Sequence, residues 1–221
     1  MSNMKTNKLG ASARHTTPNV QRLTVMLTFG AALALGIGCM QSNPVRADAE
    51  TAVIGKSAPG FSLPNVVTGR TFTLASVVDT RKATVVMFIS TRCPVSNAYD
   101  DRMEELVRKY SHNGVAFMGI NANSPESVAE CADHARAHGF TFPILKDVHN
   151  VVADSYGARV TPETYVIDSH GILVYHGRID NSMDLADVQS HELADALDAV
   201  LAGKPVSPAV TKSFGCSIKR E

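Results

Sequence analysis

The residue of this chain best placed for chemistry is a cysteine that follows an apolar run. The run from Val85 to Ser90 leads into Thr91-Arg92-Cys93-Pro94-Val95-Ser96, a pattern typical of a strand that passes directly into a helix. At that junction we expect the Cys93 sulfur to lie beside the free N–H groups of the first helical turn, where the helix dipole favours thiolate over thiol. Pro94 suits the first helical position because it has no N–H, and the Arg92 cation is expected to lower the thiol pKa further. Since thiolates attack disulfides and peroxides, we interpret Cys93 as a reactive thiol rather than a buried structural one.

A second cysteine, Cys216, lies in a tail after the last expected helix. A mobile C-terminal cysteine could resolve a sulfenate or a mixed disulfide formed at Cys93. The alternative is a tail thiol that docks by packing, and the apolar neighbours Phe214 and Ile218 indicate that the tail docks somewhere. Three thiols follow residue 49, and this odd count leaves at least one of them unpaired within the chain.

Cys131, His134 and His138 share one face of an expected helix, at spacings that metal ligands use. A helix in a histidine-containing chain yields such triplets by chance. We therefore expect Cys131 to pack in the core and the histidines to be solvated, and we predict no metal site and no cofactor.

The N-terminal 49 residues have the features of an export segment. Five basic residues stand against one acid there, and the stretch from Leu23 to Cys39 is apolar or small apart from threonines. Ala47-Asp48-Ala49 supplies a small-x-small cleavage pattern, so we predict a signal peptide over 1–49 and a periplasmic or otherwise extracytoplasmic location. An uncleaved anchor, or a lipid at Cys39, would be the only contact with a membrane.

The rest of the chain predicts one domain over 50–203 and a tail over 204–221. It is mildly acidic, with 16 Lys and Arg against 20 Asp and Glu, and it has no basic cluster of the kind that nucleic acids require. The periodicity of apolar residues predicts a hairpin, a buried strand–helix–strand crossover, a further helix, a second hairpin and a closing helix. Their expected ranges are 58–64 with 70–74, 84–90, 94–111, 115–121, 124–138, 142–145, 148–156, 165–167 with 172–175, and 190–202. We expect Ser124 to cap the helix over 124–138. The predicted class is α/β, a three-layer sandwich with a mixed central sheet.

These elements resemble the thioredoxin-fold superfamily, and most closely its redoxin branch, the alkyl hydroperoxide reductase/thiol-specific antioxidant type. The resemblance covers roughly residues 55–202 and rests on Ala58-Pro59-Gly60-Phe61-Ser62-Leu63, the strand–Cys–Pro–helix element and Thr161-Pro162 before a hairpin. It implies a cis peptide bond before Pro162, with that proline lying against the active-site cysteine. Thr161, Pro162 and Ser96 would then line the place where a substrate docks.

The chain departs from its relatives at the positions that define their chemistry. Ser96 stands where thioredoxins have the second cysteine of Cys-x-x-Cys, Met87 where they have a buried acid, and Arg92 where they have a tryptophan. The peroxiredoxin pattern Pro-x-x-x-Thr-x-x-Cys fits no better, because Val86 takes the proline position when the pattern is framed on Cys93.

Three functions compete. The favoured one is an exported thiol–disulfide oxidoreductase with Cys93 as nucleophile, Arg92 and Thr91 beside it, and Cys216 as the candidate resolving residue; its partners would be a disulfide-bearing protein or a small thiol. The second is a thiol peroxidase that reduces hydroperoxides, for which Ser90, Thr91 and Arg159 are the candidate donors. The third is a non-catalytic redox-sensing or metal-handling module.

Overall fold

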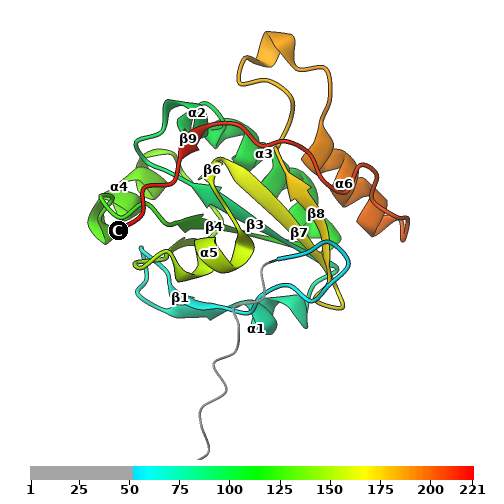
Figure 1. The fold of residues 1–221 in the computed structure, drawn as a ribbon, viewed down its shortest axis with the longest axis horizontal. Coiled ribbons are helices and arrows are strands. Elements are labelled where there is room, and N and C mark those ends of the chain that lie inside the picture. The colour runs from blue at the N-terminus through cyan, green and yellow to red at the C-terminus, as the bar shows by residue number, and fades with distance from the viewer. Residues whose placement is uncertain (1–51) are drawn as a thin grey trace, which may run out of the picture. The chain divides into compact units, whose positions relative to one another are not determined.

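The computed structural model describes residues 52–221, and its centre is a five-stranded mixed sheet (Figure 1). The strand order is β5-β4-β3-β7-β8. The strands are β3 Ala83–Ile89, β4 Val115–Asn121, β5 Ile144–Lys146, β7 Glu163–Asp168 and β8 Leu173–Gly177. β3, β4 and β5 run parallel, and β7 and β8 are antiparallel to their neighbours. Every residue of β3 is buried, as its continuous apolar sequence predicts for a strand covered on both faces.

Helices cover both faces of this sheet, which confirms the predicted three-layer α/β sandwich. One face packs against α3 (Asp100–Tyr110), α4 (Val128–Ala137) and α6 (Glu192–Leu201). The opposite face packs against α1 (Leu74–Val78) and α5 (Val151–Tyr156). The expected first hairpin is present as β1 (Ser62–Pro64) and β2 (Thr71–Thr73). None of the helices in residues 52–221 combines the length and the apolar character that a bilayer span requires.

Two helices differ from their predicted bounds for reasons that the contacts explain, while α5 and α6 lie within their predicted ranges. The helix expected over 94–111 is interrupted after α2 (Pro94–Asn97), and α3 begins at Asp100 and leads into the 3-10 turn η1 (Ser111–Asn113). At the interruption the buried Tyr99 hydroxyl donates to Asp180 at 2.7 Å, which is a long-range contact that helical periodicity does not encode. The helix expected from Ser124 begins at Val128 instead, because Ser127 is the residue that caps it, accepting from the Glu130 N–H at 3.1 Å.

The C-terminal residues are docked along the domain, as the apolar neighbours Phe214 and Ile218 indicated. After α6 the chain passes β8, where the His176 N–H donates to Ala209 and the Thr211 N–H donates to His176. It then forms β9 (Cys216–Ser217), which pairs antiparallel with the two-residue β6 (Val160–Thr161). Ile218 is buried in the core, so an apolar anchor lies two residues after Cys216. A second 3-10 turn, η2 (Leu185–Asp187), precedes α6.

The predicted export segment over 1–49 lies outside the described residues. The prediction of cleavage after Ala49, an anchor or a lipid at Cys39 therefore rests on the sequence.

Candidate active site around Cys93

Cys93 is the N-cap residue of α2, as the Cys-Pro junction predicts. Its sulfur accepts a hydrogen bond from the Ser96 N–H at 3.3 Å, so the side chain faces the first turn of the helix. Pro94 occupies the start of the helix. Cys93 is only 2% exposed, and it lies just beyond the carboxyl end of β3. The thiol is thus positioned at the helix start by its sequence neighbours Pro94 and Ser96.

The Thr161-Pro162 peptide bond is cis, as the resemblance implied, and it brings a partner to the sulfur. The Cys93 thiol donates to the Thr161 carbonyl at 3.3 Å. The Thr161 hydroxyl is buried and has no hydrogen-bond partner among residues 52–221. A thiolate at Cys93 would be an acceptor for this hydroxyl, so the orphaned O–H suits the ionised form better than the thiol.

Cys216 reaches Cys93 through the β6–β9 pair. Cys216 is the register partner of Thr161, whose carbonyl already contacts the Cys93 sulfur. This pairing places Cys216 close enough to Cys93 for each cysteine to shift the pKa of the other, and both are free thiols in this structure. Gly215 makes this approach possible: it adopts φ +151°, and a Cβ there would lie 1.9 Å from the Thr161 carbonyl oxygen.

These contacts set opposite pKa shifts on the two cysteines. Burial acts to raise the pKa of Cys93, but the Cys216 thiol, the Ser96 N–H and the Thr161 hydroxyl can all donate to a thiolate and outweigh it, so the pKa is lowered from its usual value. The pKa of Cys216 is raised, first because its proton can be shared with the neighbouring Cys93 sulfur and then because of burial. The arrangement therefore favours a thiolate on Cys93 and a proton on Cys216.

Cys131 behaves as a structural residue, as expected. It is buried among core side chains, and burial raises the pKa of its thiol to about 11. A thiol with such a pKa carries little thiolate at neutral pH, so Cys131 is a poor nucleophile.

A buried carboxylate, Glu126, holds the loop between β3 and Cys93, and it was not among the residues predicted from the sequence. The two carboxylate oxygens accept four hydrogen bonds, from the Ser90 hydroxyl at 2.5 Å, the Thr91 N–H at 2.7 Å, the Thr91 hydroxyl at 2.8 Å and the Asn121 amide at 2.6 Å. Ser90 in turn accepts from the Cys93 N–H at 3.1 Å. The backbone of Cys93 is thus held through the Ser90 hydroxyl to the carboxylate of Glu126.

A signal for Glu126 does exist in the sequence. β3 and β4 are parallel and in register, with Ile89 opposite Asn121, so their carboxyl ends share an edge of the sheet. An acid a few residues after the second strand is placed to meet the loop after the first. Lys146 lies at the same edge, on β5, and its buried ammonium donates to Asn121 and to the Asn123 carbonyl at 2.8 and 2.7 Å. Burial lowers the pKa of Lys146.

Arg92 pairs with Glu130 instead of acting on the Cys93 thiol, which is where the sequence placed its charge. Its guanidinium binds Glu130 of α4 through two contacts of 2.6 and 2.7 Å and is 57% exposed. The hydrogen bond from Arg92 is also the first cause of the low pKa of Glu130, about 2. The groups that stabilise the Cys93 thiolate are Cys216, Ser96 and Thr161 instead. Arg92 is therefore placed to hold α4 against the loop.

The remaining predicted site residues are arranged as follows. The Thr91 hydroxyl donates to Glu126 and Glu130, and the Ser96 hydroxyl accepts from the Ser90 N–H at 3.1 Å. Arg159 has an exposed side chain, although its backbone N–H donates to Glu163 and its carbonyl accepts from Ile218. Ser90, Thr91, Ser96 and Thr161 are thus gathered around Cys93, but the Ser90 and Thr91 hydroxyls are directed at Glu126.

Comparison with known proteins gives the family. Residues 54–176 match the family model described as the AhpC/TSA family. The chain is 30% identical over 155 residues to a thiol-disulfide oxidoreductase ResA from Halalkalibacterium halodurans, covering 70% of this chain and 85% of that one.

Solved structures agree with this assignment. A hypothetical protein from Sinorhizobium meliloti superposes with a TM-score of 0.71 at 35% identity, covering 78% of this chain and 97% of that one. The peroxidoxin BcpB from Mycobacterium tuberculosis shares the fold, with a TM-score of 0.52 at 22% identity, over 69% of this chain and 97% of that one. The chain belongs to the AhpC/TSA family and is a thioredoxin-fold, thiol-dependent oxidoreductase.

Proposed function

We propose that this protein is an exported thiol–disulfide oxidoreductase in which Cys93 is the nucleophile and Cys216 the resolving residue. The observation that carries the proposal is the position of Cys216: it is the register partner of Thr161, whose carbonyl accepts from the Cys93 thiol at 3.3 Å at the start of α2. Cys93, with its lowered pKa, suits the first attack, and Cys216, with its raised pKa, lies beside it as the resolving residue.

The reaction has two exchange steps. The Cys93 thiolate attacks one sulfur of a substrate disulfide, a Cys93–substrate disulfide forms, and the other substrate sulfur leaves as a thiolate. Cys216, once deprotonated, attacks the Cys93 sulfur, forms the Cys93–Cys216 disulfide and releases the second substrate thiolate. The substrate gains two electrons, the protein loses two, and an external dithiol must reduce the protein again. Run in reverse, the same steps oxidise a dithiol substrate.

Access to Cys93 requires a small rearrangement. The sulfur is almost fully buried, whereas Cys216 is half-buried. The segment beside Cys93 is the two-residue β9, held to the equally short β6. Lifting so short a strand breaks few hydrogen bonds, and we propose that this opening admits the substrate to Cys93.

Disulfide exchange fits the site better than peroxide reduction. A peroxidase needs donors directed at the oxygen that leaves. The Ser90 and Thr91 hydroxyls donate to Glu126, and the Arg159 side chain is exposed. Exchange needs no such donors, because both the attacked atom and the leaving group are sulfur.

We also propose the kind of partner and the location of the protein. A disulfide-bearing protein or a small thiol is the proposed substrate, and the N-terminal segment, with its basic head, its apolar run and Ala47-Asp48-Ala49, supports export to an extracytoplasmic compartment. Such a compartment is oxidising, which suits a cysteine pair that cycles between dithiol and disulfide.

The test is to trap the intermediate. In the full-length chain, Cys216→Ala should accumulate a mixed disulfide at Cys93 with a model disulfide substrate, whereas the unsubstituted chain should form the Cys93–Cys216 bond, both read by non-reducing peptide mapping. Cys131→Ala is the matched control and should behave as the unsubstituted chain. Substrate turnover by Cys93→Ala, or no bond to Cys216 in the oxidised unsubstituted chain, would refute the proposal. A bond that forms with hydrogen peroxide but not with disulfides would favour the peroxidase.

A further inference from the structure

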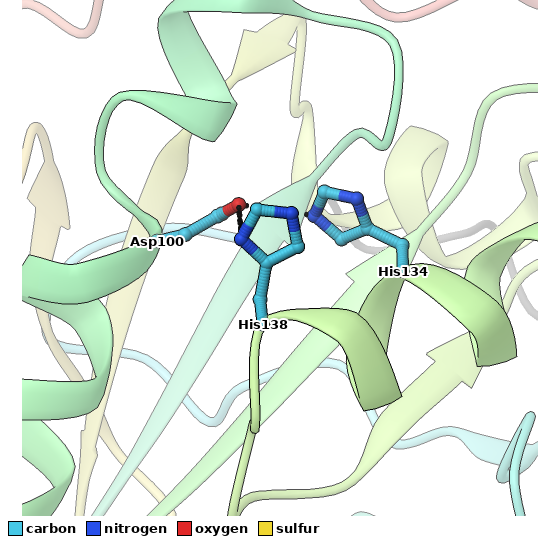
Figure 2. A group of neighbouring side chains, drawn as sticks. All are labelled: Asp100, His134 and His138. Atoms are coloured by element: carbon cyan, nitrogen blue, oxygen red, sulfur yellow. Dashed lines mark hydrogen bonds and ion pairs between the residues drawn. The ribbon is translucent and has the colours of Figure 1, made fainter.

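A second group of chemistry-bearing side chains lies between α3 and α4, apart from the thiols. Asp100 starts α3, and His134 and His138 are one helical turn apart at the end of α4 (Figure 2). The Asp100 Oδ2 atom is 3.0 Å from His134 Nε2 and 3.2 Å from His138 Nδ1. The three candidate ligand atoms all lie within 4.8 Å of one another. Among the described residues this is the one group of three or more such side chains.

In the folded chain Asp100, and not Cys131, forms a group with His134 and His138. Cys131 shares a helix face with the histidines but faces the core, and Asp100 from α3 takes its place. The prediction that the histidines are merely solvated is wrong for His134, whose side chain is 13% exposed.

The surroundings of Asp100 leave its charge to the histidines. Its side chain is 5% exposed, and its ion-pair contacts in residues 52–221 are the two imidazoles. The nearest arginine in sequence, Arg102, binds Asp180 at 2.7 Å instead. The first turn of α3 favours a carboxylate, but a nearly buried one also gains from a cation bound directly to it.

Two of the three spacings suit a metal ion directly, and the two imidazole nitrogens lie within 4.8 Å of each other. Metal–ligand bonds of about 2.0–2.1 Å in tetrahedral geometry place neighbouring ligand atoms roughly 3.3 Å apart. The distances from Asp100 to the two imidazole nitrogens are 3.0 and 3.2 Å, so an ion needs shifts of only a few tenths of an ångström there. His138 is 41% exposed, so one side of the group opens to solvent.

We propose that Asp100, His134 and His138 bind a divalent transition-metal ion, Zn²⁺ foremost, with water as the fourth ligand on the His138 side. Two imidazoles and one carboxylate are borderline donors that suit Zn²⁺, Co²⁺ or Cu²⁺, whereas Mg²⁺ and Ca²⁺ require a set of oxygens. The ion would tie α3 to α4, the helix whose Glu130 binds Arg92 next to the reactive cysteine. The alternative is a carboxylate that only hydrogen-bonds to two histidines.

The thiols of this chain also bind metals, so the test has to separate the two kinds of ligand. The full-length chain with Cys93→Ser and Cys216→Ser is titrated with Co²⁺, followed by visible absorption and by competition with Zn²⁺. We expect one equivalent bound with d–d bands and without the near-ultraviolet thiolate-to-cobalt band. Adding His138→Gln or Asp100→Asn should weaken binding by more than about tenfold, because loss of a direct ligand costs at least as much as loss of an outer-shell partner.

His170→Gln is the matched control, since this histidine is 82% exposed and lies on the β7–β8 turn, away from the group. It should leave affinity and stoichiometry unchanged. Any of three results would overturn the proposal: no saturation at a tenfold excess of Co²⁺, a thiolate-to-cobalt band, or equal Co²⁺ affinity in the His138→Gln and control chains. His138→Gln alters a half-exposed side chain, so it also keeps the test valid if Asp100→Asn fails to fold.

Discussion

Gly215→Ala tests the geometry of the proposed cysteine pair. The glycine adopts φ +151°, a region that other residues rarely enter, and an added Cβ would lie 1.9 Å from the Thr161 carbonyl oxygen and 2.7 Å from its carbon. Both atoms belong to the backbone, so no side chain can rotate away. β9 must therefore move away from β6, and Cys216 must move with it.

The magnitude follows from the size of that movement. Ordinary contact begins near 3.4 Å, so the strand has to shift by more than 1 Å from the 1.9 Å position. A misplacement of about 1 Å at reacting atoms costs roughly 100-fold in rate, which corresponds to about 2.7 kcal/mol in the barrier. We expect the second step, attack of Cys216 on the Cys93 mixed disulfide, to slow by this factor.

The assay uses an aromatic disulfide whose thiolate is coloured. In stopped-flow mixing with the reduced full-length chain, the first release reports attack on the reagent and the second reports resolution. Gly215→Ala should separate the two phases, whereas Gly60→Ala, where an added Cβ has no neighbour within 4 Å, should not. A second phase within about twofold of the unsubstituted rate, in a folded Gly215→Ala chain, would refute the claim that β9 positions Cys216.

Three further predictions concern the groups around the site. Glu126→Gln turns charge-assisted hydrogen bonds from Ser90, Thr91 and Asn121 into neutral ones and should lower the free energy of unfolding by about 3 kcal/mol. Glu130→Gln alters a partly exposed ion pair and should lower the free energy of unfolding by less than about 1 kcal/mol. Equal losses of unfolding free energy for the two variants in urea denaturation would contradict this difference. Because hydrogen bonds lower the pKa of Cys93, its alkylation rate should reach half its maximum below pH 9.0, and Cys216→Ala should move that midpoint upward; an unchanged midpoint would exclude Cys216 as a donor. Burial opposes the ionisation of Glu163, but hydrogen bonds from His176 and from two backbone N–H groups prevail and lower its pKa, so the stabilisation is present above pH 4.5 and is lost as the pH falls through the lowered pKa. Glu163→Gln should flatten that part of the stability curve, and an unaltered acid limb would show that another group produces it.

Most of the fold could be predicted because its signals are local. The fully apolar β3 identifies a strand buried on both faces, and the Cys-Pro pair identifies a helix start. The bounds that were missed depend on contacts from distant segments. α3 starts late beside Tyr99, which bonds to Asp180, and Ser127 rather than Ser124 caps α4 while Glu126 turns toward the β3 loop.

The position of Cys93 at a helix start was predicted more securely than the contacts of its neighbours. Arg92 adjoins Cys93 in sequence, yet its guanidinium turns to Glu130, which offers two short contacts. The same applies to the metal group, where Cys131 faces the core and Asp100 completes the set. Neighbours in sequence compete for partners that only the packed structure brings within reach.

The sequence by itself determined that a cysteine caps a helix after a buried strand, because capping and apolar periodicity depend on adjacent residues alone. Only the tertiary structure decided what surrounds that sulfur. Thr161, 68 positions away, Glu126, 36 positions beyond Ser90, and Cys216 in the docked tail meet there because the parallel β3 and β4 end at one edge and β9 pairs with β6. The pKa of Cys93 depends on burial and on these long-range hydrogen bonds, which exist only once the sheet and the tail have assembled.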